Sequence, residues 1–202
     1  MPIAMPTSPG FSACRFGLET NTQRFESPLT NSVQRLALGG AYWQATYTLP
    51  PMNRPQMAQW QAFLMQLEGG ANTFSGYDPD ATTPRGAATG TPLVNGAGQT
   101  GSTLAIDGCT ASVTGWGKAG DYFACNGQLH MLTADCNTNG SGQTTLAFKP
   151  ALRSSPADNA PVTFTNPTVP MILADDGQAV WQSGNRLGFY EGLTFSAREV
   201  FA

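Results

Sequence analysis

Apolar and polar residues alternate along residues 42–49, which read YWQATYTL. Aromatic and β-branched residues dominate this run, and Pro50 and Pro51 follow it directly. Strands favour such residues, whereas proline interrupts the hydrogen bonding of a sheet. The pattern therefore predicts a β-strand that ends at the two prolines.

The period changes to that of a helix immediately afterwards. Asn53 stands at the cap position, Pro55 lies in the first turn, and Gln56 follows the cap by three residues, which is the spacing of a capping box. Gly69 and Gly70 end the pattern. The apolar positions recur every three or four residues, and we expect them to pack as a core stripe on the preceding strand: Met57, Trp60, Phe63, Leu64 and Leu67.

Short alternating runs fill the middle of the chain and predict four or five short strands. The pair Asn126-Gly127 separates two of these runs, which is the pattern of a tight hairpin. Many short strands at close spacing are typical of a small barrel or sandwich. The runs are residues 103–106, 121–125, 128–133, 144–148 and 162–164, and a further strand of alternating character is expected at 193–201.

The amino-acid composition changes near Ala81 and again near Asn166, and the stretch between them is rich in Gly, Thr and Asn. We therefore expect a mainly β protein with one short helix. Residues 1–80 and 166–202 would form a split β scaffold, or belt, and residues 81–165 an inserted small β-barrel or sandwich. Insertions of this kind occur at loops whose ends lie close together, here near Pro79 and Pro167.

Charged residues make up only 11% of the 202 residues, and the net charge is −3. No basic block occurs, so a nucleic-acid partner is disfavoured, because phosphate binding needs clustered Lys and Arg. A folded chain with so few charges is often one whose surface is covered by partners. The alternative is simply a polar, uncharged β protein.

No apolar run is long enough for a membrane helix, and residues 1–6 lack the features of a signal peptide. We therefore expect synthesis in a cytoplasm and no membrane insertion. The four cysteines form no C-x-x-C pair, so no zinc site is expected. A disulfide among Cys109, Cys125 and Cys136 stays geometrically open, although a reducing compartment favours free, buried thiols.

Residues 96–101, GAGQTG, match the spacing of a dinucleotide-binding loop. That function needs a helix after the glycines, so that the pyrophosphate meets a helix N-terminus. The strand-like residues 103–106 follow instead. The motif therefore indicates a turn, and we expect no cofactor.

Candidate catalytic groups are few, and we expect no enzyme. His130 is the only histidine, so a Ser/His/Asp system would need it with Asp121 or Asp135 as partner. Its position between apolar residues of a strand favours a surface or hydrogen-bonded histidine instead. The acid pairs 78/80 and 175/176 would suit a glycosidase only across a cleft, and their turn-like contexts favour hydrogen bonding to their own backbone.

Three aromatic residues are candidates for a sugar-binding platform: Trp116, Tyr122 and Trp181. Trp116, between two glycines in what looks like an exposed loop, is the best single candidate, and Tyr122 is the second possible ligand contact. Core packing or a contact between subunits is the alternative for these residues.

The two ends of the chain resemble the distal tail protein family of long-tailed, siphovirus-type bacteriophages. The resemblance rests on residues 43–49 (WQATYTL), 59–69 (QWQAFLMQLEG), 72–74 (NTF) and 77–79 (YDP), and on the closing segment 190–199 (YEGLTFSARE). In that family an alternating strand precedes a short helix with a Phe-Leu pair, and an aromatic residue and an Asp-Pro or Pro-Pro turn follow.

The resemblance implies a structural protein of the virion, without catalytic activity. Its copies would form a ring, hexameric in the family, at the tail tip between the tail tube protein and the hub or fibre proteins. The inserted domain would face outward and contact other tail proteins or host-surface glycans. A carbohydrate-binding module that works through Trp116 is the alternative function.

Overall fold

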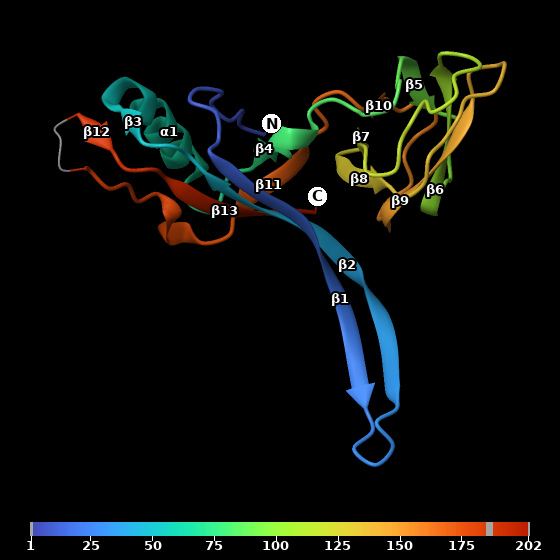
Figure 1. Ribbon diagram of the computed structural model, residues 1–202, viewed down its shortest axis with the longest axis horizontal. Helices are drawn as coiled ribbons and strands as arrows, with labels where there is room; N and C mark the ends of the chain where they lie inside the picture. The colour runs from blue at the N-terminus through green and yellow to red at the C-terminus, as the bar shows by residue number, and fades with distance from the viewer. Residues whose placement is uncertain (1, 185–187, 202) are drawn as a thin grey trace.

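Three parts make up the molecule: a scaffold sheet with one helix, a separate small barrel, and a long hairpin that projects away from both (Figure 1). The computed structural model describes residues 2–184 and 188–201. The protein is mainly β, as predicted. The scaffold sheet is antiparallel, and its strand order is β1 (Ala13–Glu26), β2 (Val33–Thr48), β13 (Thr194–Glu199), β11 (Val169–Leu173), β4 (Phe74–Gly76).

The one α-helix of the described residues, α1 (Arg54–Leu67), forms as its sequence predicts. Gln56 N donates to Asn53 Oδ1 at 3.1 Å, and Asn53 N donates to Gln56 Oε1 at 3.2 Å, so both halves of the capping box are present. Glu68 ends the helix in the left-handed conformation, with φ 49°. The predicted stripe is buried, and Trp60 packs against Phe195 of β13 with ring centroids 6.0 Å apart. A two-stranded ribbon of β3 (Met52–Asn53) and β12 (Phe189–Tyr190) adjoins the helix start.

The inserted unit is a six-stranded sheet that nearly closes into a barrel. Val94 N donates to Ala160 O at 2.9 Å, which brings the two edge strands together. Asn126 and Gly127 both have positive φ and join two strands as the predicted tight hairpin. One strand, β5, was missed by the sequence pattern, because its Gly-Thr-Pro start has neither strand composition nor alternation. The strand order is β10 (Val162–Thr163), β7 (Tyr122–Cys125), β8 (Gln128–Leu132), β9 (Thr144–Leu152), β6 (Gly101–Cys109), β5 (Gly90–Val94).

The chain passes between scaffold and barrel twice, at adjacent places. Tyr47 Oη donates to Tyr77 O at 2.7 Å and holds the outgoing segment on the scaffold. A short 3-10 helix, η1 (Pro79–Ala81), follows, capped by Asp78 as the predicted turn requires. Asn166 N donates to Thr82 O at 2.7 Å, so the returning segment lies beside the outgoing one. The strands of the six-stranded sheet come from residues 90–163, and those of the scaffold sheet from residues 13–76 and 169–199.

The hairpin of β1 and β2 was not predicted in its outer part. The sequence indicates a strand over 42–49, whereas β2 begins at Val33 and pairs with β1 along its whole length, apart from one irregularity. The outer residues are exposed on both faces of the hairpin. Since neither face packs on the body, no alternation of apolar and polar positions marks these strands.

Candidate interaction surfaces

The outer part of the hairpin, residues 20–38, is here called the arm. The strand register places its side chains on two faces. Phe25, Leu36 and Leu38 share the face that we call the apolar face, with exposed fractions of 65%, 58% and 37%. Arg24 lies directly opposite Arg35 on the other face, the arginine face. The arm therefore presents apolar side chains to its surroundings and buries none of the large ones.

The arm leaves the body at an irregularity in the ladder. Glu19 pairs with Tyr42 and Asn21 pairs with Leu38, so three residues of β2 face a single residue of β1 between these pairs. Gly40 has φ 89°, a conformation that favours glycine. Such bulges bend a ribbon. The bend directs the arm away from both the scaffold and the barrel (Figure 1).

An isolated two-stranded hairpin is only marginally stable in water. Within the described part of the chain no third strand pairs with the arm, and its large apolar side chains are exposed on both faces. Large exposed apolar patches usually mark a contact with another molecule. We therefore identify the arm as the candidate interaction surface of the chain.

The scaffold sheet also has one open edge. At the β4 edge, the N-terminal segment adds a bridge: Ile3 N donates to Thr73 O at 2.8 Å, and Ser75 N donates to Ile3 O at 3.1 Å. No other strand of the described residues pairs with the outer side of β1. An unpaired edge strand is a template for a strand of another molecule.

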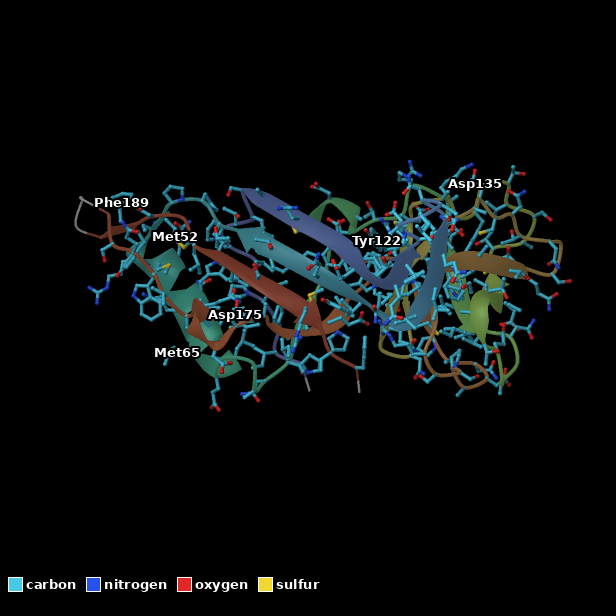
Figure 2. All side chains as sticks on the ribbon, turned by 90° about the horizontal axis from the view of Figure 1, so that it is seen from below. Met52, Met65, Tyr122, Asp135, Asp175 and Phe189 are labelled. Atoms are coloured by element: carbon cyan, nitrogen blue, oxygen red, sulfur yellow. The ribbon has the colours of Figure 1, made fainter. Side chains whose placement is uncertain are left out.

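The barrel docks on the same face of the scaffold sheet that α1 covers further along. Trp43 Nε1 donates to Leu129 O of β8 at 2.7 Å. Tyr122 packs edge-on against Trp43 and Phe16, with centroid distances of 5.4 and 5.9 Å. Figure 2 shows Tyr122 between the scaffold ribbon and the barrel. Tyr122 is therefore an interdomain contact, and burial raises its pKa to about 12.

An ion pair closes the same interface. Arg153 Nη1 and Nη2 donate to Glu199 Oε1 and Oε2 at 2.5 and 2.6 Å, in the bidentate geometry that fits guanidinium to carboxylate. Arg153 Nη2 also donates to Ala41 O at 2.8 Å, and Trp43 N donates to Glu199 Oε2 at 3.0 Å. Since the Glu199 side chain is 1% exposed, this pair fixes how the barrel sits on the scaffold.

The prediction that Trp116 lies in an exposed loop is wrong. Its side chain is 0% exposed and packs in the barrel core, 5.0 Å from the ring of Phe164. Trp116 Nε1 donates to Thr89 O at 3.0 Å, which satisfies its polar atom inside the core. Glycine on both sides gave the segment the composition of a surface loop, but the indole turns inward. Trp181 follows the 3-10 helix η2 (Asp176–Gln178) in the scaffold half of the chain, so the three aromatic candidates form no common platform.

His130 is completely buried and hydrogen-bonded. Of the two expected alternatives, a surface histidine or a hydrogen-bonded one, the structure shows the second. Its Nδ1 lies 2.9 Å from Pro150 O, and since a carbonyl only accepts, Nδ1 carries the proton. The pKa of His130 is lowered to about 4, mainly by burial and also by the charge of Arg153, while the hydrogen bond to Pro150 O acts in the opposite direction. The two proposed acid partners have other contacts, and neither orients the imidazole.

Both of these acids hold loops of the barrel. Asp121 accepts backbone N–H bonds from Arg85, Gly86 and Lys118 at 2.8 to 3.0 Å. Asp135 accepts from Lys118 Nζ at 2.8 Å, and this bond is the main cause of its lowered pKa. Figure 2 shows Asp135 on the outer side of the barrel.

The G-x-G-x-x-G match at 96–101 is a loop that ends in strand β6, as the turn hypothesis predicts. Gln99 holds the loop together, because its Nε2 donates to Ala105 O at 3.0 Å while its Oε1 accepts from Ala105 N at 2.7 Å. The loop therefore leads into a strand and not into a helix whose N-terminus could bind a phosphate.

The four cysteines are free thiols. Burial raises the pKa of Cys14 and of Cys109 to about 12 and that of Cys125 to about 11, so these thiols are poor nucleophiles near neutral pH. Within residues 2–184 and 188–201, no group of three or more His, Cys, Asp or Glu side chains is placed to hold a metal ion. None of the helices in this described part is long and apolar enough to cross a lipid bilayer.

No model of a known protein family matches the sequence, and no curated protein matches it either.

Proposed function

We propose that this chain is a structural protein of a phage tail tip. Its copies assemble into a ring, hexameric by the family resemblance, that connects the tail tube protein with the hub or fibre proteins. The observation that carries the proposal is the arm, whose exposed Phe25 and Leu36 would be buried only by another molecule. The resemblance of residues 43–79 and 190–199 to distal tail proteins supplies the context of a tail.

A ring needs two different patches on each subunit, because the contact between neighbours is heterologous and must close. The chain offers more than one such patch. The arm is the first patch. The second is the outer edge of β1 in the scaffold sheet, where no strand of the described residues pairs with it. Two different surfaces fit a ring better than a two-fold dimer, in which one patch meets its own copy.

The composition supports extensive association. Charged residues are 11% of the chain, and lateral contacts that bury few charges avoid much desolvation cost. The barrel, held on the scaffold by Trp43 and the Arg153–Glu199 pair, would be a rigid outward module. In this proposal it contacts other tail proteins or host-surface glycans after assembly in the host cytoplasm.

The mass of the purified protein in solution tests the proposal. Light scattering, with negative-stain images of the same fraction, compares the intact chain with a variant in which residues 22–37 are replaced by Asn-Gly. This turn joins Asn21 and Leu38, which pair in the ladder, so the inner hairpin and the body are kept. We expect closed rings from the intact chain and monomers of unchanged thermal stability from the variant. A monomeric intact chain at all concentrations, or rings formed without the arm, would contradict the proposal.

A further inference from the structure

The two arginines on the arginine face of the arm have no ion-pair partner among the described residues. Arg24 and Arg35 are exposed and face one another directly across the two strands. Like charges in directly opposite positions destabilise a strand pair. The ion pairs within the described residues are Arg85–Asp121, Lys118–Asp135 and Arg153–Glu199, and none includes either arginine of the arm.

A surface of opposite character lies at the C-terminal end of α1. Glu68 at the helix cap, Asp175 and Asp176 are all exposed. Asp176 lies against this helix end, since its Oδ1 accepts from Gly70 N at 3.0 Å. Met65, with 62% of its surface exposed, lies in the last turn of α1, where its carbonyl accepts from Glu68 N at 3.3 Å, and so belongs to the same corner. We call these four residues the helix-end corner.

The carboxylates of this corner also lack a cationic partner among the described residues. Asp175 precedes the 3-10 helix η2 without making a side-chain cap bond, so its charge serves no local structure. The two surfaces differ in net charge, because Arg24, Arg35 and the exposed Glu26 opposite Val33 give the arginine face a net charge of +1, whereas the three carboxylates give the corner −3. They are also complementary in apolar content, because Val33, 50% exposed, shares the arginine face as Met65 shares the corner.

We propose that the arginine face of the arm docks on the helix-end corner of a second copy of this chain. The inference rests on the proposed function, which it deepens by naming the partner surface of the arm. The arm extends away from its own scaffold (Figure 1), which favours a neighbouring corner over the corner of the same chain. The contact joins two different patches, so repeating it from copy to copy generates a ring where the rotation between neighbours closes.

Charge exchange tests the docking. R24E/R35E reverses the charge of the two arginine positions on the arm, and E68K/D175K reverses the charge of two acidic positions at the corner. The quadruple variant carries both changes, so the two surfaces again have opposite signs. Asp176 stays unchanged because it holds Gly70 N. The control R54E/R198E makes the same change in net charge as R24E/R35E, on exposed positions outside the arm, strand β1 and the helix-end corner. Sedimentation velocity over a concentration series measures self-association of all five proteins.

We expect each double variant to associate roughly 10- to 100-fold more weakly, since the reversal places like charges in contact. The quadruple variant, and an equimolar mixture of the two double variants, should regain association, while the control keeps that of the unaltered chain. Rings of unchanged affinity from R24E/R35E, equal loss in the control, or no recovery in the quadruple variant would overturn the docking and leave the ring in place. A monomeric unaltered chain would instead contradict the proposed function itself.

Discussion

Trp43 and Leu129 join the two folded units of the chain: the indole Nε1 of the scaffold strand β2 donates to the carbonyl of the barrel strand β8 at 2.7 Å. Both residues are buried, with exposed fractions of 2% and 1%. A buried carbonyl that loses its donor pays its desolvation without compensation. The strand that dominates the sequence pattern therefore also determines where the barrel sits.

Replacing Trp43 with Phe should lower the free energy of unfolding by about 1–3 kcal/mol, because Leu129 O loses its partner. Thermal or urea unfolding measures this. Trp60→Phe is the matched control, since Trp60 Nε1 is buried with no partner among the described residues. Trp60→Phe therefore breaks no hydrogen bond, and its effect on stability combines the lost indole volume with the removal of an unpaired buried N–H. Equal destabilisation by the two substitutions would contradict the importance of the Trp43 bond.

Trp60→Ala should cost about 3–5 kcal/mol of stability, because the indole is 0% exposed and packs on Phe11, Phe63 and Phe195. Urea denaturation with the slope held in common gives the difference. Met65→Ala on the same helix is the control, and its 62% exposure predicts a change within about 0.5 kcal/mol. A Trp60→Ala protein as stable as the original would show that α1 does not pack as described.

The Arg153–Glu199 pair should show strong coupling. R153M leaves the Glu199 carboxylate buried beside Trp43 N as its remaining partner, and E199Q leaves the guanidinium without its anion. Removing one member of a buried pair costs about 3–5 kcal/mol. The double variant R153M/E199Q should be less destabilised than the sum of the single variants by about 1–3 kcal/mol. Additive free energies in this double-mutant cycle would mean that the pair does not act as a unit.

Stability should fall at acidic pH through His130. Its pKa is about 4 in the fold, against the unperturbed value of 6.5. Between these values the unfolded chain binds the proton and the folded chain does not. The contribution is therefore fully present above about pH 6.5 and is lost as the pH falls toward 4, by about 3 kcal/mol in total.

Unfolding free energies from pH 8 to pH 4 measure this loss, and His130→Leu provides the comparison. The leucine variant should be less stable at pH 8, because Pro150 O loses its donor, but its stability should fall less between pH 6.5 and pH 4. Parallel pH profiles of the two proteins would show that another group is responsible.

Local sequence patterns predict the parts of this fold that have local causes. The Asn53–Gln56 box, the Asn126-Gly127 hairpin and the helical stripe each depend on residues a few positions apart. The side on which Trp116 points depends on Thr89 and Phe164, which are distant in the sequence. No local pattern contains that information, so an indole between two glycines looked exposed.

The arm escaped prediction for a different reason. Amphipathic alternation marks a strand because one face is buried in the same chain, and both faces of residues 20–38 are exposed in the single chain. The sequence there contains large apolar residues, among them Phe25, Val33 and Leu36, which the single chain leaves exposed. The alternation of β2 from Trp43 onward is clear because its odd-numbered positions meet α1 and the barrel.

If the apolar face of the arm binds a neighbouring molecule, its residues should matter for assembly and not for folding. F25S/L36S removes the two large side chains of this face, exposed by 65% and 58% in the single chain. We expect a change in monomer stability within about 0.5 kcal/mol per site, because little buried contact is lost. Burial of such side chains in an interface contributes roughly 1.5–3 kcal/mol each, so self-association should weaken by at least about tenfold.

Analytical ultracentrifugation and thermal unfolding of the same samples separate the two effects. Thr22→Ser, on the opposite face of the same strand, is a mild control that should leave association unchanged. If F25S/L36S also associates as strongly as the unaltered chain, the apolar face stays in water.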